Sequence, residues 1–294
     1  MNGRALVAMF VCAQPDCGGA LAVRARGLVL GCRRCPAIYP VLAGVPVLVP
    51  SPPSYLASYR DAVLATLAEA GAATRDVVAL IDQLAALAPR SEALGFGDDW
   101  TADEQARPRA ATADPAIAGW LAAAPDPAAA IAAAVPTAAK VVLELGCGGN
   151  ALAGRLIKRG RTVVVADLSL RAVVRTMNAT GAIGAVVDAE ALPLARGAAD
   201  AIIAANLIDL LTDPDALLTA MAAALRPGGV AIISTPDPSL GSDDDDLLAT
   251  LLADAGLAPR AWHRGVPWLR AHSSRHFQLY FAELVVADRA RRRR

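Results

Sequence analysis

The sequence predicts an α/β protein with a parallel main sheet, preceded by a small β-rich unit. Five short apolar runs in the second half of this 294-residue chain alternate with helical segments, and such alternation is typical of a parallel sheet with helices on both faces. Four cysteines among the first fifty residues predict the small unit, and a helical pattern follows it. We therefore expect a β-rich unit over residues 1–50, a helical connector over 51–136 and an α/β domain over 137–290.

The composition indicates a folded chain without a membrane span. Hydrophobic residues make up 55% and charged residues 19%, which supplies a core and argues against disorder. No apolar run reaches the length of about 18 residues that a transmembrane helix needs. The first ten residues hold one basic side chain and no cleavage region before Cys12, so we expect no export signal and a cytoplasmic location.

The charge balance disfavours a nucleic-acid partner. The chain has 28 basic and 28 acidic residues, whereas a dedicated nucleic-acid binder usually carries a basic excess. The basic tail over residues 289–294 is interpreted as a frayed terminus, and the acidic run over 243–246 has the opposite sign.

Four cysteines predict a structural zinc site. Cys12 and Cys17 form one pair, and Cys32 and Cys35 form a second pair after a fourteen-residue spacer. Short cysteine pairs at turns can arrange four thiolates tetrahedrally around zinc, which would leave no open position for catalysis. The alternatives are four reduced thiols or, in an exported protein, two disulfides; the missing export signal favours zinc.

The segment after the cysteines has a pattern of its own. Ile38–Leu42 and Val45–Leu48 are two short apolar strands around an Ala-Gly turn, and they contain Tyr-Pro-Val-x-x-Gly-Val-Pro. Residues 10–50 resemble the zinc-ribbon family that includes the activator subunit of tRNA, ribosomal and release-factor methyltransferases. This resemblance implies that the unit could contact a protein partner.

The connector is predicted to be helical. Leucine, valine and isoleucine recur at three- and four-residue intervals over 55–88, with Gly71 separating two helices. Residues 89–108 are interpreted as a loop, and further helices are expected from Pro115 and up to about Val135. We expect this connector to pack between the two domains rather than to form a lid.

The most informative stretch is a strand followed by a glycine turn. Val141–Leu145 is apolar apart from one acid, and Gly146 and Gly148 follow before a helical pattern. Glycines allow positive φ angles and a close approach of the backbone to a ligand. The next strand ends at Asp167, a position from which a carboxylate can accept both hydroxyls of a ribose. Together these features predict a nucleoside-containing cofactor.

Four motifs in order identify the family that the domain resembles. They are Glu-x-Gly-x-Gly at 144–148, Asp-Leu-Ser at 167–169, Asp-Ala-Glu-Ala-Leu-Pro-Leu at 188–194 and Leu-Arg-Pro-Gly-Gly at 225–229. With them, residues 137–236 resemble the Rossmann-like class I S-adenosylmethionine-dependent methyltransferases, in particular the small-molecule and quinone-biosynthesis type. The resemblance implies S-adenosylmethionine as cofactor.

The resemblance also implies roles around the glycine turn. Glu144 would meet the amino group of the cofactor, directly or through water, and Gly146 and Gly148 would pack against its methionine and ribose parts. Asn150 stands where a third glycine is common, and asparagine tolerates left-handed geometry, so we expect binding to survive. Cys147 is interpreted as a small filler of the turn.

The remaining matches concern the nucleoside. Asp167 would bind the ribose hydroxyls and Asp188 the exocyclic amine of adenine, although both could be ordinary helix caps or turn acids. Three further matches are Leu168 beside the adenine, the amide of Ala189, and the pair Asn206 and Leu207 in the loop that passes the cofactor and faces the substrate.

The methyl acceptor is harder to predict. Methyl transfer from a sulfonium is an in-line displacement, in which the protein mainly positions the acceptor and excludes water. A base is needed only for a weakly acidic nucleophile. All three histidines lie among aromatic residues near the C-terminus, where the family places its substrate side; His276, then His272, is the expected base, ahead of His263. Two interpretations of Asp209 stay open with equal weight: a charge on the surface and a contact with the substrate.

The favoured interpretation is a methyltransferase for a small-molecule or peptide-derived substrate. One alternative is an RNA base methyltransferase, because a four-cysteine N-terminal domain before this fold also resembles ribosomal guanine N-methyltransferases. The other is a non-catalytic partner subunit with a methyltransferase fold.

Overall fold

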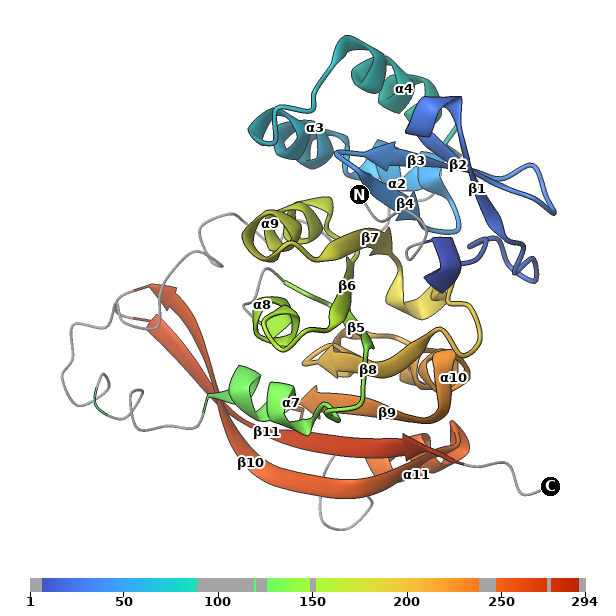
Figure 1. Ribbon diagram of the computed structural model, residues 1–294. Helices are drawn as coiled ribbons and strands as arrows, with labels where there is room; N and C mark the ends of the chain where they lie inside the picture. The colour runs from blue at the N-terminus through green and yellow to red at the C-terminus, as the bar shows by residue number, and fades with distance from the viewer. Residues whose placement is uncertain are drawn as a thin grey trace.

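A single mixed sheet runs through the whole protein. The computed structural model describes residues 7–88, 119, 126–148, 152–237, 247–273 and 276–290. Within these ranges, eleven strands follow one another in the order β1-β2-β3-β4-β7-β6-β5-β8-β9-β11-β10 (Figure 1). The α/β prediction is confirmed, but the sheet is mixed, because antiparallel strands flank its parallel centre.

The parallel centre matches the strands expected from the apolar runs. Neighbouring strands pair in register, so that their carboxyl ends meet along one edge of the sheet. We call this the carboxyl edge. The strands are β5 (Val141–Leu145), β6 (Thr162–Asp167), β7 (Ile183–Val187), β8 (Ala199–Ala205) and β9 (Leu225–Thr235).

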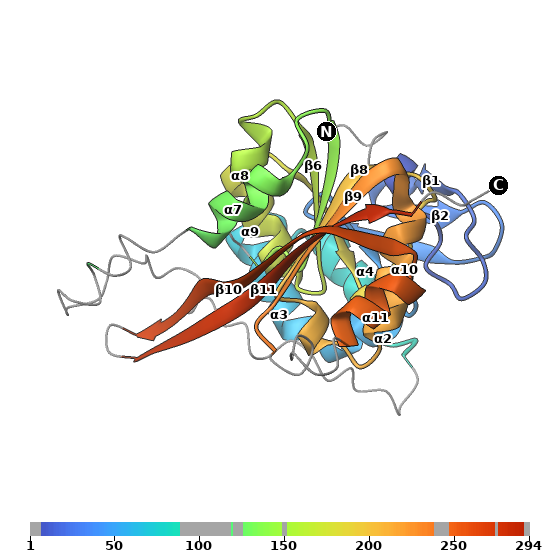
Figure 2. The same cartoon turned by 90° about the horizontal axis from the view of Figure 1, so that it is seen from below.

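The last two strands form a long hairpin. β10 (Leu257–Ser273) pairs with β11 (His276–Arg289), and β11 pairs with β9 from Glu283 to Asp288. Because Glu283 lies opposite Thr235, the final residue of β9, residues 276–282 continue past the carboxyl edge. At about 3.3 Å per residue, this part of the hairpin, which we call the arm, extends roughly 20 Å. Figures 1 and 2 show the arm projecting from the body.

The four-cysteine unit, residues 7–50, extends the same sheet. β1 (Leu21–Arg24), β2 (Val29–Cys32), β3 (Ile38–Leu42) and β4 (Val45–Leu48) are antiparallel neighbours, which confirms the two strands expected around the Ala-Gly turn. β4 then pairs in parallel with β7, Val47 opposite Val186 and Leu48 opposite Val187. Nothing in the sequence predicted this pairing. It makes the unit a continuation of the main sheet.

The described helices follow the sequence pattern, except that the segment before Gly71 is not one helix but divides at Tyr59 into α2 and α3. Gly71 separates α3 from α4 as expected, and Ser51, Thr74, Asp126, Ser169 and Asp213 each accept an N–H at a helix start. The expected loop over 89–108 and the helix from Pro115 lie outside the described residues. The helices are α2 (Pro52–Ser58), α3 (Arg60–Glu69), α4 (Arg75–Ala85), α7 (Pro127–Ala134), α8 (Leu152–Ile157), α9 (Leu170–Thr180), α10 (Pro214–Ala224) and α11 (Leu247–Asp254).

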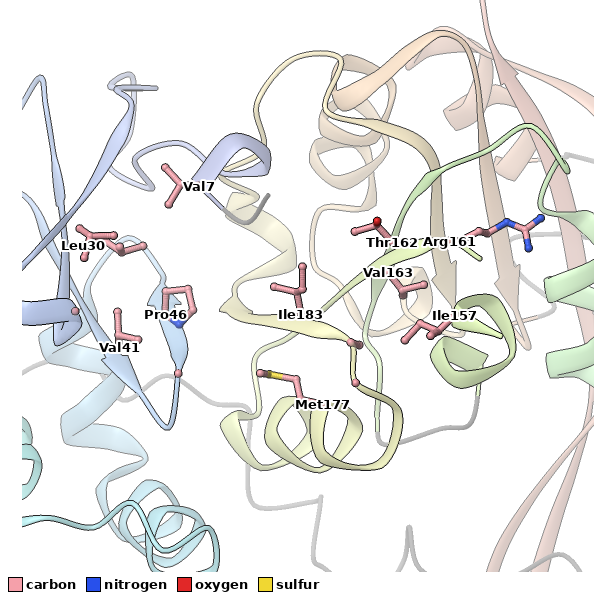
Figure 3. A pocket seen from close by; sticks show the side chains of 15 residues that line it. Val7, Leu30, Val41, Pro46, Ile157, Arg161, Thr162, Val163, Met177 and Ile183 are labelled. Carbon is pink, nitrogen blue, oxygen red and sulfur yellow. The ribbon is translucent and has the colours of Figure 1, made fainter. Parts of the chain in front are cut away.

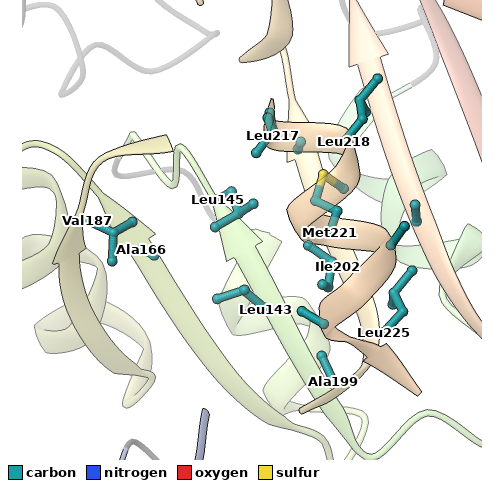
Figure 4. Packing of buried hydrophobic residues seen from close by; sticks show 14 of the residues in the cluster. Leu143, Leu145, Ala166, Val187, Ala199, Ile202, Leu217, Leu218, Met221 and Leu225 are labelled. Carbon is teal, nitrogen blue, oxygen red and sulfur yellow. The ribbon is translucent and has the colours of Figure 1, made fainter. Parts of the chain in front are cut away.

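Helices cover both faces of the sheet. The face toward α10 and α11 forms one apolar cluster and the face toward α8 and α9 forms another, and both clusters include residues of the four-cysteine unit. Figure 4 shows Leu217, Leu218 and Met221 of α10 packed among strand residues such as Leu145 and Ile202. No helix in the described ranges has both the length and the apolar character required to cross a bilayer.

Candidate functional site

The cofactor residues expected from the sequence gather along the carboxyl edge. From β7 to β8, this edge carries Asp188, Asp167, the Gly146 turn and Asn206. Asp167 is the last residue of its strand, and the others immediately follow theirs. These positions lie next to one another because the parallel strands are paired in register and their carboxyl ends are therefore at the same level. Ligands of open α/β sheets bind at this edge.

The glycine turn after β5 has the backbone geometry that glycine favours. Gly146 and Gly148 have φ angles of 64° and 47°. The N–H of Gly146 donates to the carbonyl of Ala166 at 2.8 Å, which fixes the turn against β6. A Cβ on Gly146 would lie 3.3 Å from Cδ1 of Leu207, so a side chain here would be both strained and crowded. Asn150 lies outside the described residues.

Asp167 links the glycine turn to the next loop. Its Oδ2 accepts the N–H of Gly148 at 3.0 Å, and its Oδ1 accepts the N–H of Ser169 at 2.9 Å. Burial raises the pKa of the carboxyl above its usual value, while the N–H groups of Ser169, Gly148 and Leu168 act in the opposite direction. The carboxylate is therefore held in a fixed orientation between two turns.

Asp188 ends β7 in a similar way. Its Oδ1 accepts the N–H of Glu190 at 2.9 Å and caps the short 3-10 helix Ala189–Ala191. Burial raises the pKa of Asp188, and the neighbouring Glu190 charge adds to the rise. Asp188 is thus a helix cap, whereas Asp167 is a turn acid, because Ser169 caps α9. Neither role excludes ligand contacts from the same oxygens.

The inner residues of the edge are buried or tied to β9. The Glu144 side chain is 1% exposed and lies in β5, one residue before the strand ends. Asn206 adopts a φ angle of 51°, which asparagine tolerates, and its N–H donates to the carbonyl of Ser234 at 2.8 Å. The Ser234 hydroxyl donates to Oδ1 of Asn206 at 2.8 Å, so this amide is oriented toward β9.

Asp209 lies half-buried where β8 and β9 end. The Thr235 hydroxyl donates to its Oδ1 at 3.3 Å. Burial raises the pKa of Asp209, and the nearby charge of Asp237 adds to the rise. By contrast, Asp200 lies at the opposite edge, where it pairs with Arg226 at 2.6 Å, as expected for a structural acid at a strand start.

Tyr55 is a residue of this region that the sequence analysis missed. It belongs to α2 in the connector, is 2% exposed, and its hydroxyl donates to the carbonyl of Leu168 at 2.9 Å. Its ring centroid lies 5.0 Å from that of Tyr59. The contact joins positions 113 residues apart, and no local sequence signal could reveal it.

The two expected catalytic histidines are placed at the tip of the arm. His276 is the first residue of β11 and pairs with Ser273, and His272 is the second-last residue of β10. The arm continues beyond the carboxyl edge, on the side of the sheet where Asp167 and Asp188 lie. His263 lies lower in β10, opposite Leu284, and is exposed.

The four expected metal ligands come together in the N-terminal unit. All four Sγ atoms lie within 4.8 Å of one another, with Cys12 and Cys35 3.5 Å apart and Cys17 and Cys32 3.7 Å apart. A tetrahedral zinc site with Zn–S bonds of about 2.3 Å has S···S edges of about 3.8 Å. None of the four is joined in a disulfide. The arrangement fits a four-thiolate metal site.

The surroundings of these thiols differ. Burial raises the pKa of Cys12 to about 12, although the Tyr39 hydroxyl, 3.0 Å from its Sγ, favours the thiolate. The pKa of Cys32 falls to about 6: burial opposes ionisation, but the N–H groups of Arg34 and Cys35 outweigh it. The Arg34 N–H lies 3.2 Å from that sulfur.

A cavity of about 420 Å³ lies away from the carboxyl edge. It is formed where the four-cysteine unit meets the amino ends of β6 and β7, and its walls are mostly apolar (Figure 3). Val41 and Pro46 line one side, and Val163 and Ile183 line the other. Because strand starts surround it, this cavity lies at the opposite edge of the sheet from Asp167 and Asp188, and we assign it no part in the site.

Known proteins resemble part of this chain. A curated ubiquinone biosynthesis O-methyltransferase of Cereibacter sphaeroides is 32% identical over 111 residues, which is 36% of this chain and 44% of that protein. The chain thus spans less than half of the length of that relative. The solved N-methyltransferase NodS of Bradyrhizobium japonicum, in complex with S-adenosyl-L-homocysteine, aligns with a TM-score of 0.47 and 17% identity over 64% of this chain and 95% of its own.

A second solved structure is a complex between the Haloferax volcanii Trm112 methyltransferase activator and a methyltransferase. One of its chains aligns with a TM-score of 0.47 and 17% identity over 57% of this chain and 90% of its own. A family model described as a methyltransferase domain matches residues 75–283, well over half of the 294 residues. The chain therefore belongs to the methyltransferase-domain family.

Proposed function

We propose that this protein is an S-adenosylmethionine-dependent methyltransferase that acts on a small-molecule or peptide-derived acceptor. The observation that carries the proposal is the pair of carboxylates, Asp167 and Asp188, that follow adjacent parallel strands beside an open glycine turn. Family membership supports it.

Each residue of the edge has a task that its geometry allows. Asp167, oriented by two N–H groups, would accept the ribose hydroxyls, and Asp188 would accept the adenine amine. Gly146 and Gly148 would leave room for the methionine part, with Glu144 beneath it, while Leu168, Ala189, Asn206 and Leu207 would complete the walls. When bound, the cofactor supplies an activated methyl group on a sulfonium, so the chain has only to orient the acceptor and exclude water.

The acceptor would approach over the ends of β8 and β9. If Asp167 and Asp188 hold the nucleoside at β6 and β7, the other end of the cofactor points toward β5 and β8. The curated relatives are named O-methyltransferases, so hydroxyl-bearing small molecules are the first acceptors to test. His276, then His272, remains our proposed base, although the arm holds both roughly 20 Å beyond the edge. Asp209 offers a carboxylate at the edge itself.

We further propose that Cys12, Cys17, Cys32 and Cys35 bind a structural Zn²⁺. The support is their mutual distance and their free thiol state, and four protein ligands leave no open position on the metal. Thiolates of this kind persist in a reducing compartment, which agrees with a cytoplasmic location. The surface of the unit also remains our proposed contact for a protein partner.

Isothermal titration of the purified full-length protein with S-adenosylmethionine and S-adenosylhomocysteine tests the proposal. We expect saturable binding of one molecule per chain. If neither ligand binds a folded protein, the enzyme interpretation fails and a non-catalytic partner subunit becomes the better description.

The affinity for S-adenosylmethionine is expected to fall as the solution is made more acidic. The pKa values of Asp167 and Asp188 are raised above the ordinary 3.8, and the ionised form is the one that accepts hydrogen bonds from ribose and adenine. As the pH drops through these raised values, protonation competes with binding. The effect on folding stability has the opposite sign. A carboxyl whose pKa is raised in the folded state favours the folded, ligand-free protein at low pH, and this contribution is lost as the pH rises through the raised pKa.

Titrations at intervals from about pH 8 to about pH 5 would check this dependence, with circular dichroism confirming that the protein stays folded. A dissociation constant that stays the same down to the onset of unfolding would show that neither carboxylate meets the ligand.

A further inference from the structure

The connector reaches the carboxyl edge through one side chain. Helix α2 begins four residues after β4, with Ser51 as its cap, and its buried face includes Tyr55 and Leu56. β4 pairs with β7, so this short connection brings α2 over the ends of β7 and β6. There the Tyr55 hydroxyl donates to the carbonyl of Leu168 at 2.9 Å.

The bonded carbonyl belongs to the turn that orients Asp167. Leu168 lies between Asp167, the last residue of β6, and Ser169, the cap of α9. The Ser169 N–H donates to Asp167, and the Ser169 hydroxyl accepts the N–H of Ala172 at 3.2 Å. The Leu168 carbonyl and the Ser169 N–H are the two ends of one planar peptide group. A hydrogen bond to that carbonyl therefore restricts the N–H that holds the carboxylate.

The donor is well suited to a fixed role. The Tyr55 side chain is 2% exposed, and burial raises the pKa of its hydroxyl, so the group stays protonated across the physiological range. The adjacent Tyr59 ring, tilted by 50°, limits the positions that the Tyr55 ring can adopt. Loss of the hydroxyl would leave the Leu168 carbonyl without this donor, and the turn could relax.

We propose that Tyr55 is a positioning residue for the cofactor, which acts through the Leu168 carbonyl to hold Asp167 against the ribose. The proposal rests on the proposed function, since it assigns Tyr55 a part in the same cofactor site. It also gives α2 a task beyond packing between the two parts of the chain.

Tyr55→Phe tests the proposal because it removes one oxygen and keeps the ring. We expect the dissociation constant for S-adenosylhomocysteine, measured by titration below the melting transition, to rise about three- to tenfold. The matched control is Thr66→Val, which removes another buried hydroxyl of the connector, one that donates within its own helix to Ala62 at 2.8 Å. This variant should lose stability and keep its affinity.

A second ligand separates positioning from general loosening. With the 2′-deoxy analogue of S-adenosylhomocysteine, one of the hydroxyls that Asp167 would accept from is missing, so the loss caused by Tyr55→Phe should shrink. Equal losses for both ligands, equal losses in Tyr55→Phe and Thr66→Val, or an unchanged affinity in Tyr55→Phe would each overturn the proposal. If the unmodified protein binds neither ligand, the proposed function itself fails, whatever Tyr55 does.

Discussion

Replacing Asp167 with alanine is expected to abolish measurable binding of S-adenosylmethionine while the protein stays folded. A hydrogen bond to a charged group contributes about 1.5–3 kcal/mol, and two ribose hydroxyls would donate to this carboxylate. Losing both corresponds to a weakening of about 100-fold or more, at about 1.4 kcal/mol per tenfold change. The N–H groups of Gly148 and Ser169 would also lose their acceptor, which loosens the turns on either side. Isothermal titration measures the change.

Asp213→Ala is the matched control for Asp167→Ala. Asp213 also accepts a backbone N–H at a helix start, that of Ala216 at 3.0 Å, but it caps α10 after the loop that follows β8. Its loss should cost about 1 kcal/mol of stability and leave the affinity unchanged. If Asp167→Ala binds as tightly as the unmodified protein, the ribose is held elsewhere and the assignment of the carboxyl edge is wrong.

Removing the metal is expected to unfold the four-cysteine unit and to destabilise the whole chain. Elemental analysis of the purified protein should give one zinc per chain, and a chelator or Cys32→Ser should remove it. Small four-thiolate units generally depend on zinc for folding, and here unfolding also removes β4 from β7. We expect the melting temperature to drop by roughly 10 °C or more, since about 1 kcal/mol shifts a chain of this size by a few degrees.

Cys147→Ser controls for the loss of a buried thiol. Cys147 is fully buried in the glycine turn and stands apart from the metal cluster, so this variant should retain its zinc. Intact mass under non-reducing conditions distinguishes the disulfide alternative, because two disulfides would remove four hydrogens from the chain. A metal-free protein that melts at the same temperature as the preparation before chelation would contradict the zinc proposal.

Local signals in the sequence predicted most of the elements. The apolar runs over 141–145, 162–166 and 200–205 predict β5, β6 and β8 within about one residue, and Asp213 before Pro214 is the kind of cap that begins α10. These features depend on residues close together in the chain, where side-chain periodicity and capping chemistry act directly. The ordered motifs placed the carboxylates of the site for the same reason.

Long-range pairings could not be predicted in this way. The contact of Leu48 with Val187 joins two apolar strands that look like many others, and the register between them is set by the folded core. Tyr55 resembles an ordinary core residue of an amphipathic helix, and its hydroxyl partner lies 113 residues away. The length of the arm was missed because β10 contains two prolines and several polar residues, which weaken the alternation that identifies a strand.

The pairing of β4 with β7 also determines what the outside of the sheet presents to other molecules. Without the N-terminal unit, β7 would be the outermost parallel strand, and its apolar Ile183–Val187 backbone would offer open N–H and C=O groups to any passing strand. The unit replaces that border with β1, which has only four residues and ends in Arg24. Because β4 belongs to the same chain as β7, every copy of the parallel sheet is synthesised together with the strand that protects its edge. No separate protein has to be supplied to keep the edge of β7 from aggregating.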